Sequence, residues 1–273
     1  MMRTGTIGHS AVLATATLLA ACTTPRPAAQ VHMQGRPVLA EQNVNAAVYQ
    51  HSSAEVAWLF EQGYAFARVK LDAQLAVPDS LPPAVIVDVD ETVLDNSPYE
   101  VDNIARGRTY ADSTWKVWTA RAIAPPVPGA LQFLQYAVQR GCTIFYITNR
   151  HHSEKEATIT NLKRHGFPMA DAEHVRTMGE SSDKTERRDQ VRQAHRVVLM
   201  VGDQLTDFDQ TFRDRREAMG LPDLHRMQDD LHRSFILLPN SVYGYWRDAV
   251  TGRGSDQEKQ GMVDQFLQQH MLR

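Results

Sequence analysis

The sequence predicts an α/β protein built on a parallel sheet with helices on both faces. Short apolar runs rich in β-branched or aromatic residues recur along the chain, and each ends in polar residues. The runs are "AVIVD" (84–88), "CTIFYITN" (142–149), "RVVLMVGD" (196–203) and "SFILLPN" (234–240). Helical patterns lie between them, and strands that alternate with helices are typical of parallel sheets covered on both sides.

The size and charge of the chain agree with a single globular enzyme-sized unit. Its 273 residues are 42% hydrophobic and 22% charged, which suits one α/β domain with an elaboration. The formal net charge is −3, and acidic and basic residues are mixed along the chain. We therefore expect no nucleic-acid polymer as a partner.

The first residues predict an export signal. Arg3 precedes the short apolar stretch "AVLATATLLAA" and then "LAAC", which ends at Cys22. An apolar stretch of this length is too short to span a bilayer. "LAAC" resembles the bacterial lipobox, so we predict a signal peptide over 1–21 and lipidation of Cys22. The alternative is an ordinary signal peptide cut near Ala21.

Lipidation would place the protein in the cell envelope, with the membrane as a partner through its anchor. Thr23 follows Cys22, which by the habit of bacterial lipoproteins favours an outer-membrane lipoprotein, facing the periplasm or the surface. Only one other cysteine exists, Cys142. Without a partner it forms no disulfide, and we predict that it is a small buried hydrophobe.

The segments between the signal and the strands fall into a tether and several helices. Residues 22–43 are rich in Pro, Ala and Gln and are predicted to form a flexible tether. From Asn45 to Gln74 apolar residues recur at spacings of three and four, and "VPDSLPP" then ends the helix. Further helices are predicted over 130–141, with Gly141 as a C-cap, and then over 155–166 and 184–195.

Polar residues at the strand ends predict a ligand site. Asp88, Thr148 and Asp203 each lie where an apolar run ends. Right-handed crossovers bring the carboxyl ends of parallel strands to one edge of the sheet. Open α/β sheets bind ligands outside that edge. Residues that are far apart in the sequence should therefore meet in one cleft.

The acidic residues of this cleft predict a metal site and an acid–base catalyst. Asp88 and Asp90 follow the first run, and Asp203 and Asp207 follow the third. Clustered carboxylates raise one another's pKa unless a cation lies between them, and Mg²⁺ prefers such hard oxygen ligands. One carboxylate can attack phosphorus while a second transfers protons. The alternative is that Asp88 caps a turn and Asp203 caps a helix.

Three further residues have the chemistry of a phosphate site. Thr148 and Asn149 offer a hydroxyl and backbone amides to phosphate oxygens, although they could merely form a turn. Lys184 lies near a predicted helix N-terminus, where a cation opposes the helix dipole. We expect it to pair with an anion nearby, the alternative being an exposed side chain or an ion pair with Asp183 or Glu186.

The order of these motifs resembles a known signature. D-x-D-E-T, a strand ending in T-N, a lysine and G-D-x-x-x-D together look like the four motifs of the haloacid dehalogenase (HAD) superfamily. "VDVDETVLDNSPY" and "VLMVGDQLTDF" resemble the two signatures of its class C acid phosphatases, bacterial lipoproteins of the "DDDD" group that include 5′-nucleotidases. The similarity runs over about 53–240, and "NSVYGYW" (240–246) resembles the family's C-terminal segment. Val89, Gln204 and Thr206 are mild departures from the pattern.

The resemblance implies a role for each residue. Asp88 would be the nucleophile that forms an aspartyl-phosphate and also a Mg²⁺ ligand. Asp90 would be the general acid/base and bind the metal through its backbone carbonyl. Asp203 and Asp207 would complete the metal site. Thr148 and Asn149 would bind phosphate, and Lys184 would neutralise charge on Asp88 and the phosphoryl group.

The resemblance also implies a substrate and a domain plan. The substrate would be a phosphomonoester such as a nucleoside 5′-monophosphate, with Tyr64 and Tyr243 clamping the base, although both could simply pack in the core. A HAD-like core over 83–240 would carry a smaller, mainly helical cap that begins with 44–82. The segment 241–273 would pack on core and cap, and a homodimer is possible.

Two alternatives to a phosphatase remain from the sequence. One is a non-catalytic surface lipoprotein that binds a nucleotide, haem or a host partner on the same fold. The other is a phosphotransferase or phosphomutase with a different acceptor. Glu91 and Asp95 are predicted to shape the turn after the first strand rather than to act in catalysis. The loop residues His151 and His152 could tune acidity or simply be exposed.

Overall fold

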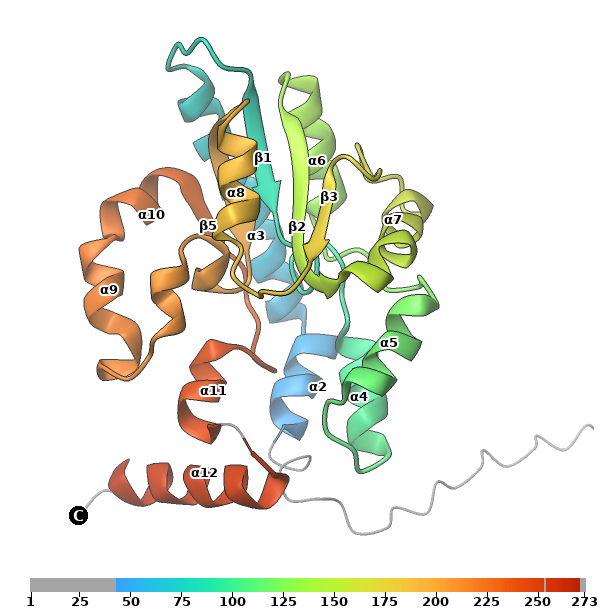
Figure 1. The fold of residues 1–273 in the computed structure, drawn as a ribbon, viewed down its shortest axis with the longest axis vertical. Coiled ribbons are helices and arrows are strands. Elements are labelled where there is room, and N and C mark those ends of the chain that lie inside the picture. The colour runs from blue at the N-terminus through green and yellow to red at the C-terminus, as the bar shows by residue number, and fades with distance from the viewer. Residues whose placement is uncertain (1–42, 253, 271–273) are drawn as a thin grey trace, which may run out of the picture. The chain divides into compact units, whose positions relative to one another are not determined.

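The computed structural model describes residues 43–252 and 254–270, which all belong to one compact unit. Five parallel strands form its sheet, in the order β3-β2-β1-β4-β5 (Figure 1). The strands are β1 Pro83–Val87, β2 Thr143–His151, β3 Val175–Met178, β4 Arg196–Gly202 and β5 Phe235–Leu237. The predicted α/β class and its four strands are confirmed. The edge strand β3 was not predicted, because its four residues, "VRTM", include only two apolar side chains.

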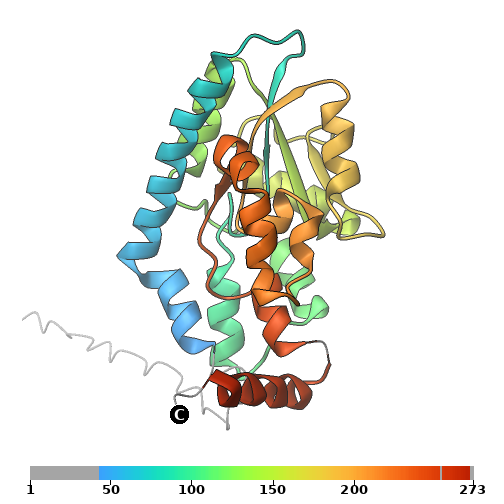
Figure 2. The same cartoon turned by 90° about the vertical axis from the view of Figure 1, so that its left-hand side faces the viewer.

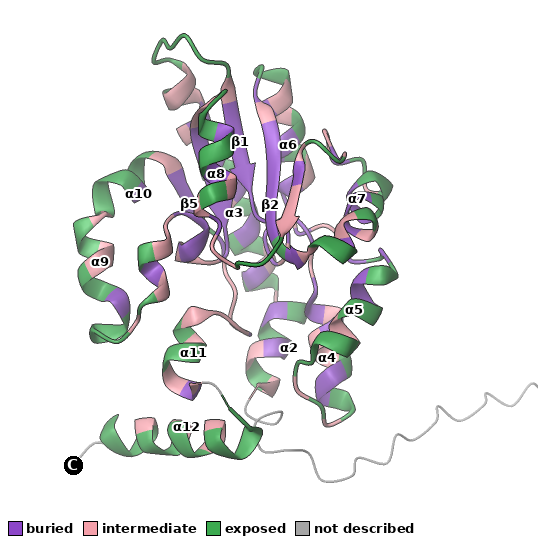
Figure 3. Cartoon of the chain, in the orientation of Figure 1, coloured by how far each residue is buried: buried purple, intermediate pink, exposed green. Residues whose placement is uncertain are grey.

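Alternate residues of the central strand face two separate hydrophobic clusters. Val85 and Val87 of β1 pack in the larger cluster, whereas Ala84 and Ile86 pack in the smaller one. This division follows from the two-residue period of a strand. Figure 3 shows β1 and β2 almost wholly buried between the helices. An apolar run without alternation therefore indicates a strand covered on both faces.

Helices on the two faces supply the rest of the core. Side chains of α3 Ala54–Leu75 and α6 Ala130–Gln139 pack in the larger cluster, together with α7 Lys155–Arg164. Val191 of α8 Thr185–Arg192 and Leu231 of α10 Gln228–Ser234 pack in the smaller one. Figure 2 shows α3 running along one side of the sheet. Helices α6, α7 and α8 confirm the three that were predicted between the strands.

The prediction that 44–82 belongs to the cap is wrong for most of its length. The chain forms two helices, α2 Val44–Ser52 and α3, and Ser53 separates them with extended backbone. The Ser53 side chain accepts a hydrogen bond from the Val56 amide and so caps α3. Because Phe60, Tyr64 and Leu71 of α3 are buried against the sheet, α3 belongs to the core.

A second group of helices lies beyond the carboxyl ends of the strands (Figure 1). It contains α2, α4 Ser97–Ala105, α5 Asp112–Ala120, α11 Tyr245–Thr251 and α12 Asp256–His270. The remaining helix α9 Leu221–Arg226 lies between β4 and β5, with the short 3-10 helices η3 Gln210–Arg213 and η4 Ala218–Gly220. Two more 3-10 helices follow the strands directly, η1 His152–Glu154 after β2 and η2 Leu205–Asp207 after β4.

The N-terminal predictions lie outside the described residues. These are the signal peptide over 1–21, the lipidated Cys22 and all of the tether except Asn43. Within the described ranges, no helix is both long and apolar enough to cross a membrane. Cys142 is buried at 2% exposure beside β2, as predicted, and burial raises the pKa of its thiol to about 11.

Candidate active site

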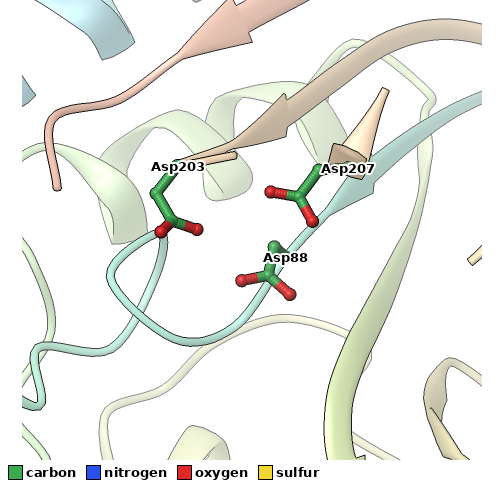
Figure 4. A group of neighbouring side chains, drawn as sticks. All are labelled: Asp88, Asp203 and Asp207. Atoms are coloured by element: carbon green, nitrogen blue, oxygen red, sulfur yellow. The ribbon is translucent and has the colours of Figure 1, made fainter. Parts of the chain in front are cut away.

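Three aspartates from two strand ends meet at the carboxyl edge of the sheet. Asp88 directly follows β1, Asp203 follows β4, and Asp207 ends η2. One oxygen from each carboxylate lies within 4.8 Å of the others, and all three residues are at most 8% exposed. Figure 4 shows the carboxylates turned toward one another. The predicted convergence of these positions is what the structure shows.

A single lysine lies against this cluster, which we call the acid cluster. Lys184 occupies the N-cap position of α8, as expected from the sequence, and is 5% exposed. Its Nζ donates to Asp207 Oδ1 at 2.7 Å and also to Asp88 Oδ1. Burial lowers the pKa of Lys184, but Asp207 and Asp88 outweigh it and the pKa is raised. The side chain therefore stays an ammonium ion.

One ammonium does not balance three buried carboxylates. Burial raises the pKa of Asp88 well above its usual range, with Asp207 and Asp203 adding to it and Lys184 opposing it. Burial, and then the charge of Asp207, raises the pKa of Asp203 to about 7. The three carboxylates outnumber the one ammonium that contacts them, so a further positive charge would be stabilised here. Three hard oxygen donors around one point fit a divalent cation such as Mg²⁺.

The loop after β4 is shaped to bring Asp207 back against the strand. A Cβ on Gly202 would lie 2.5 Å from Asp207 Cβ, so only glycine allows this approach. The amide of Gln204 donates to Asp207 Oδ2 at 2.9 Å. Asp203 Oδ2 accepts from the Gln204 side chain at 2.9 Å and from Asn240 Nδ2 at 2.8 Å. Asn240 follows β5, so a further strand end contributes to the site.

Asp90 lies in a different environment, between β1 and β2. Its carboxylate accepts from Arg150 Nη2 at 2.7 Å and from Asn96 Nδ2 at 2.8 Å, both on Oδ1. The Thr148 hydroxyl lies 3.4 Å from Asp90 Oδ2. Asp90 and Thr148 thus meet, as predicted, but the ion pair with Arg150 was not foreseen.

The turn that carries Asp90 is tightly held. Glu91 adopts a left-handed conformation, with φ at 54°, and its Oε1 accepts from the Asn96 amide at 2.8 Å. The Tyr243 hydroxyl donates to Glu91 Oε2. Burial, and then the nearby Asp90 charge, raises the pKa of Glu91. Asp95 Oδ1 in turn accepts from the Ser97 amide at 2.8 Å. Both acids shape this turn, in line with the role predicted for them.

Tyr64 does not reach the site, so its predicted role as a base clamp does not fit the structure. It is 2% exposed, and its ring packs against Phe133 with centroids 5.5 Å apart. Its hydroxyl donates to the Thr92 carbonyl, and this hydrogen bond stabilises the turn after Asp90. The helical spacing of Tyr64 in α3 is therefore that of a core residue, the alternative given above.

A cavity of about 540 Å³ opens over the acid cluster. Asp88, Asp90 and Lys184 lie at one end of it, and Asn149 and Tyr243 also line it. Aromatic and charged residues of α4, α5 and α11, and of the loop between α4 and α5, also line the cavity. They include Tyr110, Trp115, Tyr245, Arg108, Arg247 and Glu100. Burial raises the pKa of Glu100 to about 7, while Arg247 opposes this rise.

Several residues of the site were missed by the sequence reasoning. Arg150 had a usable signal, since it lies two positions after Thr148 on the same strand and so faces the same side. Asn96 stands in "DNSPY", which was read only as a loop. Trp115 had no local signal, because nothing in the sequence around it shows that α5 folds over the cleft. His151 contacts Ser153 at the start of η1, and neither His151 nor His152 lines the cavity.

Comparisons with known proteins agree with this geometry. A family model described as HAD superfamily, subfamily IIIB (acid phosphatase) matches residues 10–246. The chain is 30% identical over 130 residues to acid phosphatase 1 of Solanum lycopersicum, which covers 45% of this chain and 50% of that protein. It is 25% identical over 169 residues to the stem 28 kDa glycoprotein of Glycine max, covering 59% and 64% of the two chains. The chain thus spans between about half and two thirds of the length of these relatives.

Two solved structures match a larger share of the chain than these relatives do. The class C acid phosphatase from Bacillus anthracis superposes with a TM-score of 0.80 at 33% identity, covering 86% of this chain and 98% of that one. The same enzyme with tungstate bound gives a TM-score of 0.79 at 32% identity and the same coverage. The fold described above is therefore similar to that of a solved class C acid phosphatase.

Proposed function

Because the chain belongs to subfamily IIIB of the HAD superfamily, the acid phosphatases, we propose that it hydrolyses phosphomonoesters through an aspartyl-phosphate on Asp88. The observation that carries this proposal is the buried contact between Lys184 and the acid cluster, with Asp90 held apart beside it. In this proposal Asp88 attacks phosphorus and Asp90 transfers protons.

The first step transfers the phosphoryl group to the enzyme. A carboxylate oxygen of Asp88 attacks phosphorus as the bond to the ester oxygen breaks. Asp90, in its protonated form, donates its proton to that departing oxygen, which leaves as the alcohol. Lys184 stays positively charged and offsets the negative charge that gathers on the phosphoryl oxygens.

The second step releases phosphate. Asp90, now a carboxylate, takes a proton from a water molecule while that water attacks the phosphorus of phospho-Asp88. The bond between phosphorus and the Asp88 oxygen breaks, which returns the free carboxylate and inorganic phosphate. Asp90 has regained its proton for the next cycle.

Asp88, Asp203 and Asp207 would hold a divalent cation, which we propose is Mg²⁺. When bound, this ion would neutralise charge on the phosphoryl oxygens and the acid cluster. The fit rests on the three converging oxygens and their shortage of positive charge. A ligand role for the Asp90 backbone carbonyl stays a prediction.

Thr148 and Asn149 are proposed to bind the phosphoryl oxygens from β2. Arg187 holds this segment through two hydrogen bonds. Its Nη1 donates to the Thr148 carbonyl at 2.6 Å, and its Nη2 donates to Asn149 Oδ1 at 2.7 Å. The Thr148 hydroxyl contacts the Asp90 carboxylate, and Asn149 lines the cavity. Preorganised donors of this kind stabilise charge that develops during phosphoryl transfer.

We propose nucleoside 5′-monophosphates as the preferred substrates. The cavity above the acid cluster has room for a group larger than phosphate, and Tyr243, Trp115 and Tyr110 line it. Aromatic faces stack on nucleobases of any sequence. Tyr243 keeps the predicted role, whereas Trp115 and Tyr110 take the place that the sequence reasoning gave to Tyr64.

We also propose that the enzyme is an envelope lipoprotein anchored through Cys22. The support is the lipobox-like "LAAC" alone, since these residues lie outside the described ranges. Labelling of growing cells with a fatty-acid analogue should mark the wild-type chain and not a Cys22→Ala variant. Equal labelling of the two would contradict it. The possible homodimer stays a prediction, which light scattering would test.

Activity with and without metal tests the proposed function. Purified protein should hydrolyse p-nitrophenyl phosphate and nucleoside 5′-monophosphates at mildly acidic pH, and EDTA should abolish this. Asp72→Asn is the matched control, because Asp72 contacts Tyr136 of α6 and Arg140 directly after α6, and it does not line the cavity. A metal-loaded protein that hydrolyses no phosphomonoester in a broad panel would refute the proposal.

A further inference from the structure

We propose that Arg150 is a positioning residue that fixes the Asp90 carboxyl group so that Oδ2 is the oxygen that exchanges the proton. The inference rests on the proposed function, because it assigns a task within the same reaction. It adds a residue and an atom that the motifs themselves do not assign.

The two oxygens of Asp90 have unequal surroundings. Oδ1 accepts three hydrogen bonds, from Arg150 Nη2 at 2.7 Å, from Arg150 Nε at 3.0 Å and from Asn96 Nδ2 at 2.8 Å. Oδ2 has only the longer contacts with Arg150 Nε at 3.2 Å and the Thr148 hydroxyl at 3.4 Å. An oxygen that already accepts three bonds has no lone pair left for a proton. Oδ2 is therefore the one free to exchange it.

Arg150 is itself held too firmly to follow a moving carboxylate. Its side chain is 1% exposed, compared with 15% for Asp90. Its amide donates to Thr148 Oγ1 at 3.0 Å, and its Nη1 donates to Thr158 Oγ1 of α7 at 3.3 Å. Asn96 is fixed in the same way, because Trp118 Nε1 of α5 donates to its Oδ1 at 2.8 Å. Asp90 thus has a rigid partner on each side.

The contacts of Oδ2 link it to the segment that is proposed to bind phosphate. Thr148 is proposed to bind phosphate, and its hydroxyl contacts Oδ2 rather than Oδ1. The Arg150 guanidinium carbon lies 5.7 Å from the centre of the Trp115 ring, which lines the substrate cavity. Arg150 therefore contacts both Asp90 and a residue of the cavity wall. Accurate orientation of such a group is a large part of catalysis by proximity.

The competing explanation is a structural ion pair that only stabilises the fold. Loss of such a pair would slow all substrates alike. Loss of a positioning residue would slow substrates in proportion to their need for a proton. Alkyl phosphates need it, because an alkoxide is a poor leaving group. p-Nitrophenyl phosphate needs it little, because its phenolate leaves readily.

The test is a double-mutant cycle between Arg150→Gln and Asp90→Asn across a series of aryl and alkyl phosphates. The measured quantity is kcat/KM, which reports the transfer of the phosphoryl group to the enzyme. Arg150→Gln should lower it about 100-fold for alkyl phosphates and less than about fivefold for p-nitrophenyl phosphate. In the Asp90→Asn background, Arg150→Gln should have little further effect.

Two further variants keep the result decisive. Arg140→Gln removes an exposed arginine that pairs with Asp72 and should leave the series unchanged. Arg150→Lys keeps the positive charge but loses the bidentate contact with Asp90. The dependence of kcat/KM on the leaving group should therefore be less steep in Arg150→Lys than in Arg150→Gln. Arg150→Lys also replaces Arg150→Gln if that variant does not fold.

The outcomes separate this inference from the proposed function. An equal loss for all leaving groups, or effects of Arg150→Gln and Asp90→Asn that simply multiply, overturns the inference while the wild-type activity upholds the function. A wild-type protein that is inert on the entire series overturns both.

Discussion

The two halves of the site use the same residue type in opposite surroundings. On the β1–β4 side, three buried aspartates crowd together around one lysine. On the β1–β2 side, a single aspartate, Asp90, is bound by Arg150 and Asn96. In the first half, burial raises the pKa of Asp88 and of Asp203, and the charge of Asp207 adds to the rise. In the second half, the Asp90 carboxylate forms an ion pair with the Arg150 guanidinium.

This contrast explains how one sheet edge can supply a nucleophile and an acid–base group. A carboxylate that belongs to a cation-binding cluster stays available to attack phosphorus. A carboxylate that is kept off the cluster by its own partners can move protons instead. The identity of the side chain does not decide the role, since the environment does. The following predictions test that division of labour.

The largest expected effect is the loss of the nucleophile. Asp88→Asn should reduce kcat/KM at least about 1,000-fold for every phosphomonoester, because no second carboxylate can take its place. The loss should be independent of the leaving group, in contrast to the pattern for Arg150 and Asp90. Residual activity that varies with the leaving group would mean that the two halves are not separate.

Removal of divalent metal should have the next largest effect. Chelation with EDTA should lower turnover about 100-fold or more, and added Mg²⁺ should restore it. The protein itself should also report the ion, through a higher Tm with Mg²⁺ than with EDTA, since binding stabilises the folded state. Asp203→Asn should weaken this rise in Tm, whereas Arg140→Gln should not. An equal Tm with Mg²⁺ and with EDTA would contradict a metal site in the acid cluster.

Substitution in the cavity wall should have a smaller and more selective effect. Trp115→Ala should raise KM for AMP about 10-fold, because stacking on a base contributes about 1–3 kcal/mol. KM for a phosphomonoester without a ring should stay within about twofold of wild type. Trp58→Ala, on the exposed face of α3, is the matched control. Equal changes for both substrates would remove Trp115 from base recognition.

The last prediction concerns stability and pH in the absence of metal, conditions under which the enzyme does not turn over. The pKa of Asp203 is raised to about 7 by burial and by Asp207, compared with an ordinary value near 4. Between these values the unfolded chain has already released this proton, but the folded protein still binds it. The free energy of unfolding should therefore fall as pH rises from about 4 to about 7.

Comparison with Asp203→Asn isolates this contribution. The stability of wild type relative to the variant should decline by a few kcal/mol over this range, as an order of magnitude. Urea unfolding in EDTA at several pH values would measure it. A difference that stays constant with pH would show that Asp203 is not crowded in the folded protein.

The sequence was sufficient for four of the five described strands and for one half of the site. Asp88, Asp203 and Asp207 each stand at the end of a buried strand or in the turn after it, so topology alone brought them together. Lys184 followed from its helix N-terminus, where a cation without an anion would be unfavourable. Each of these patterns lies within a few residues, and a parallel sheet brings its strand ends to a single edge.

The other half depends on tertiary contacts that no local pattern records. Asn96 and Trp115 reach the cleft because the segment after β1 folds back over it. Tyr64 was misplaced for the opposite reason, since an aromatic at helical spacing fits a core and a cleft equally well. Likewise α3 was assigned to the cap, because an amphipathic helix does not reveal which layer it covers.

The most direct test of the account is capture of the phosphorylated enzyme. Wild-type protein mixed with substrate and quenched in acid within its first turnover should gain the mass of one phosphoryl group. The tryptic peptide over 71–106 should carry it, at Asp88, and Asp88→Asn should carry none. Phosphate release without any such adduct, or an adduct that survives in Asp88→Asn, would contradict the central claim.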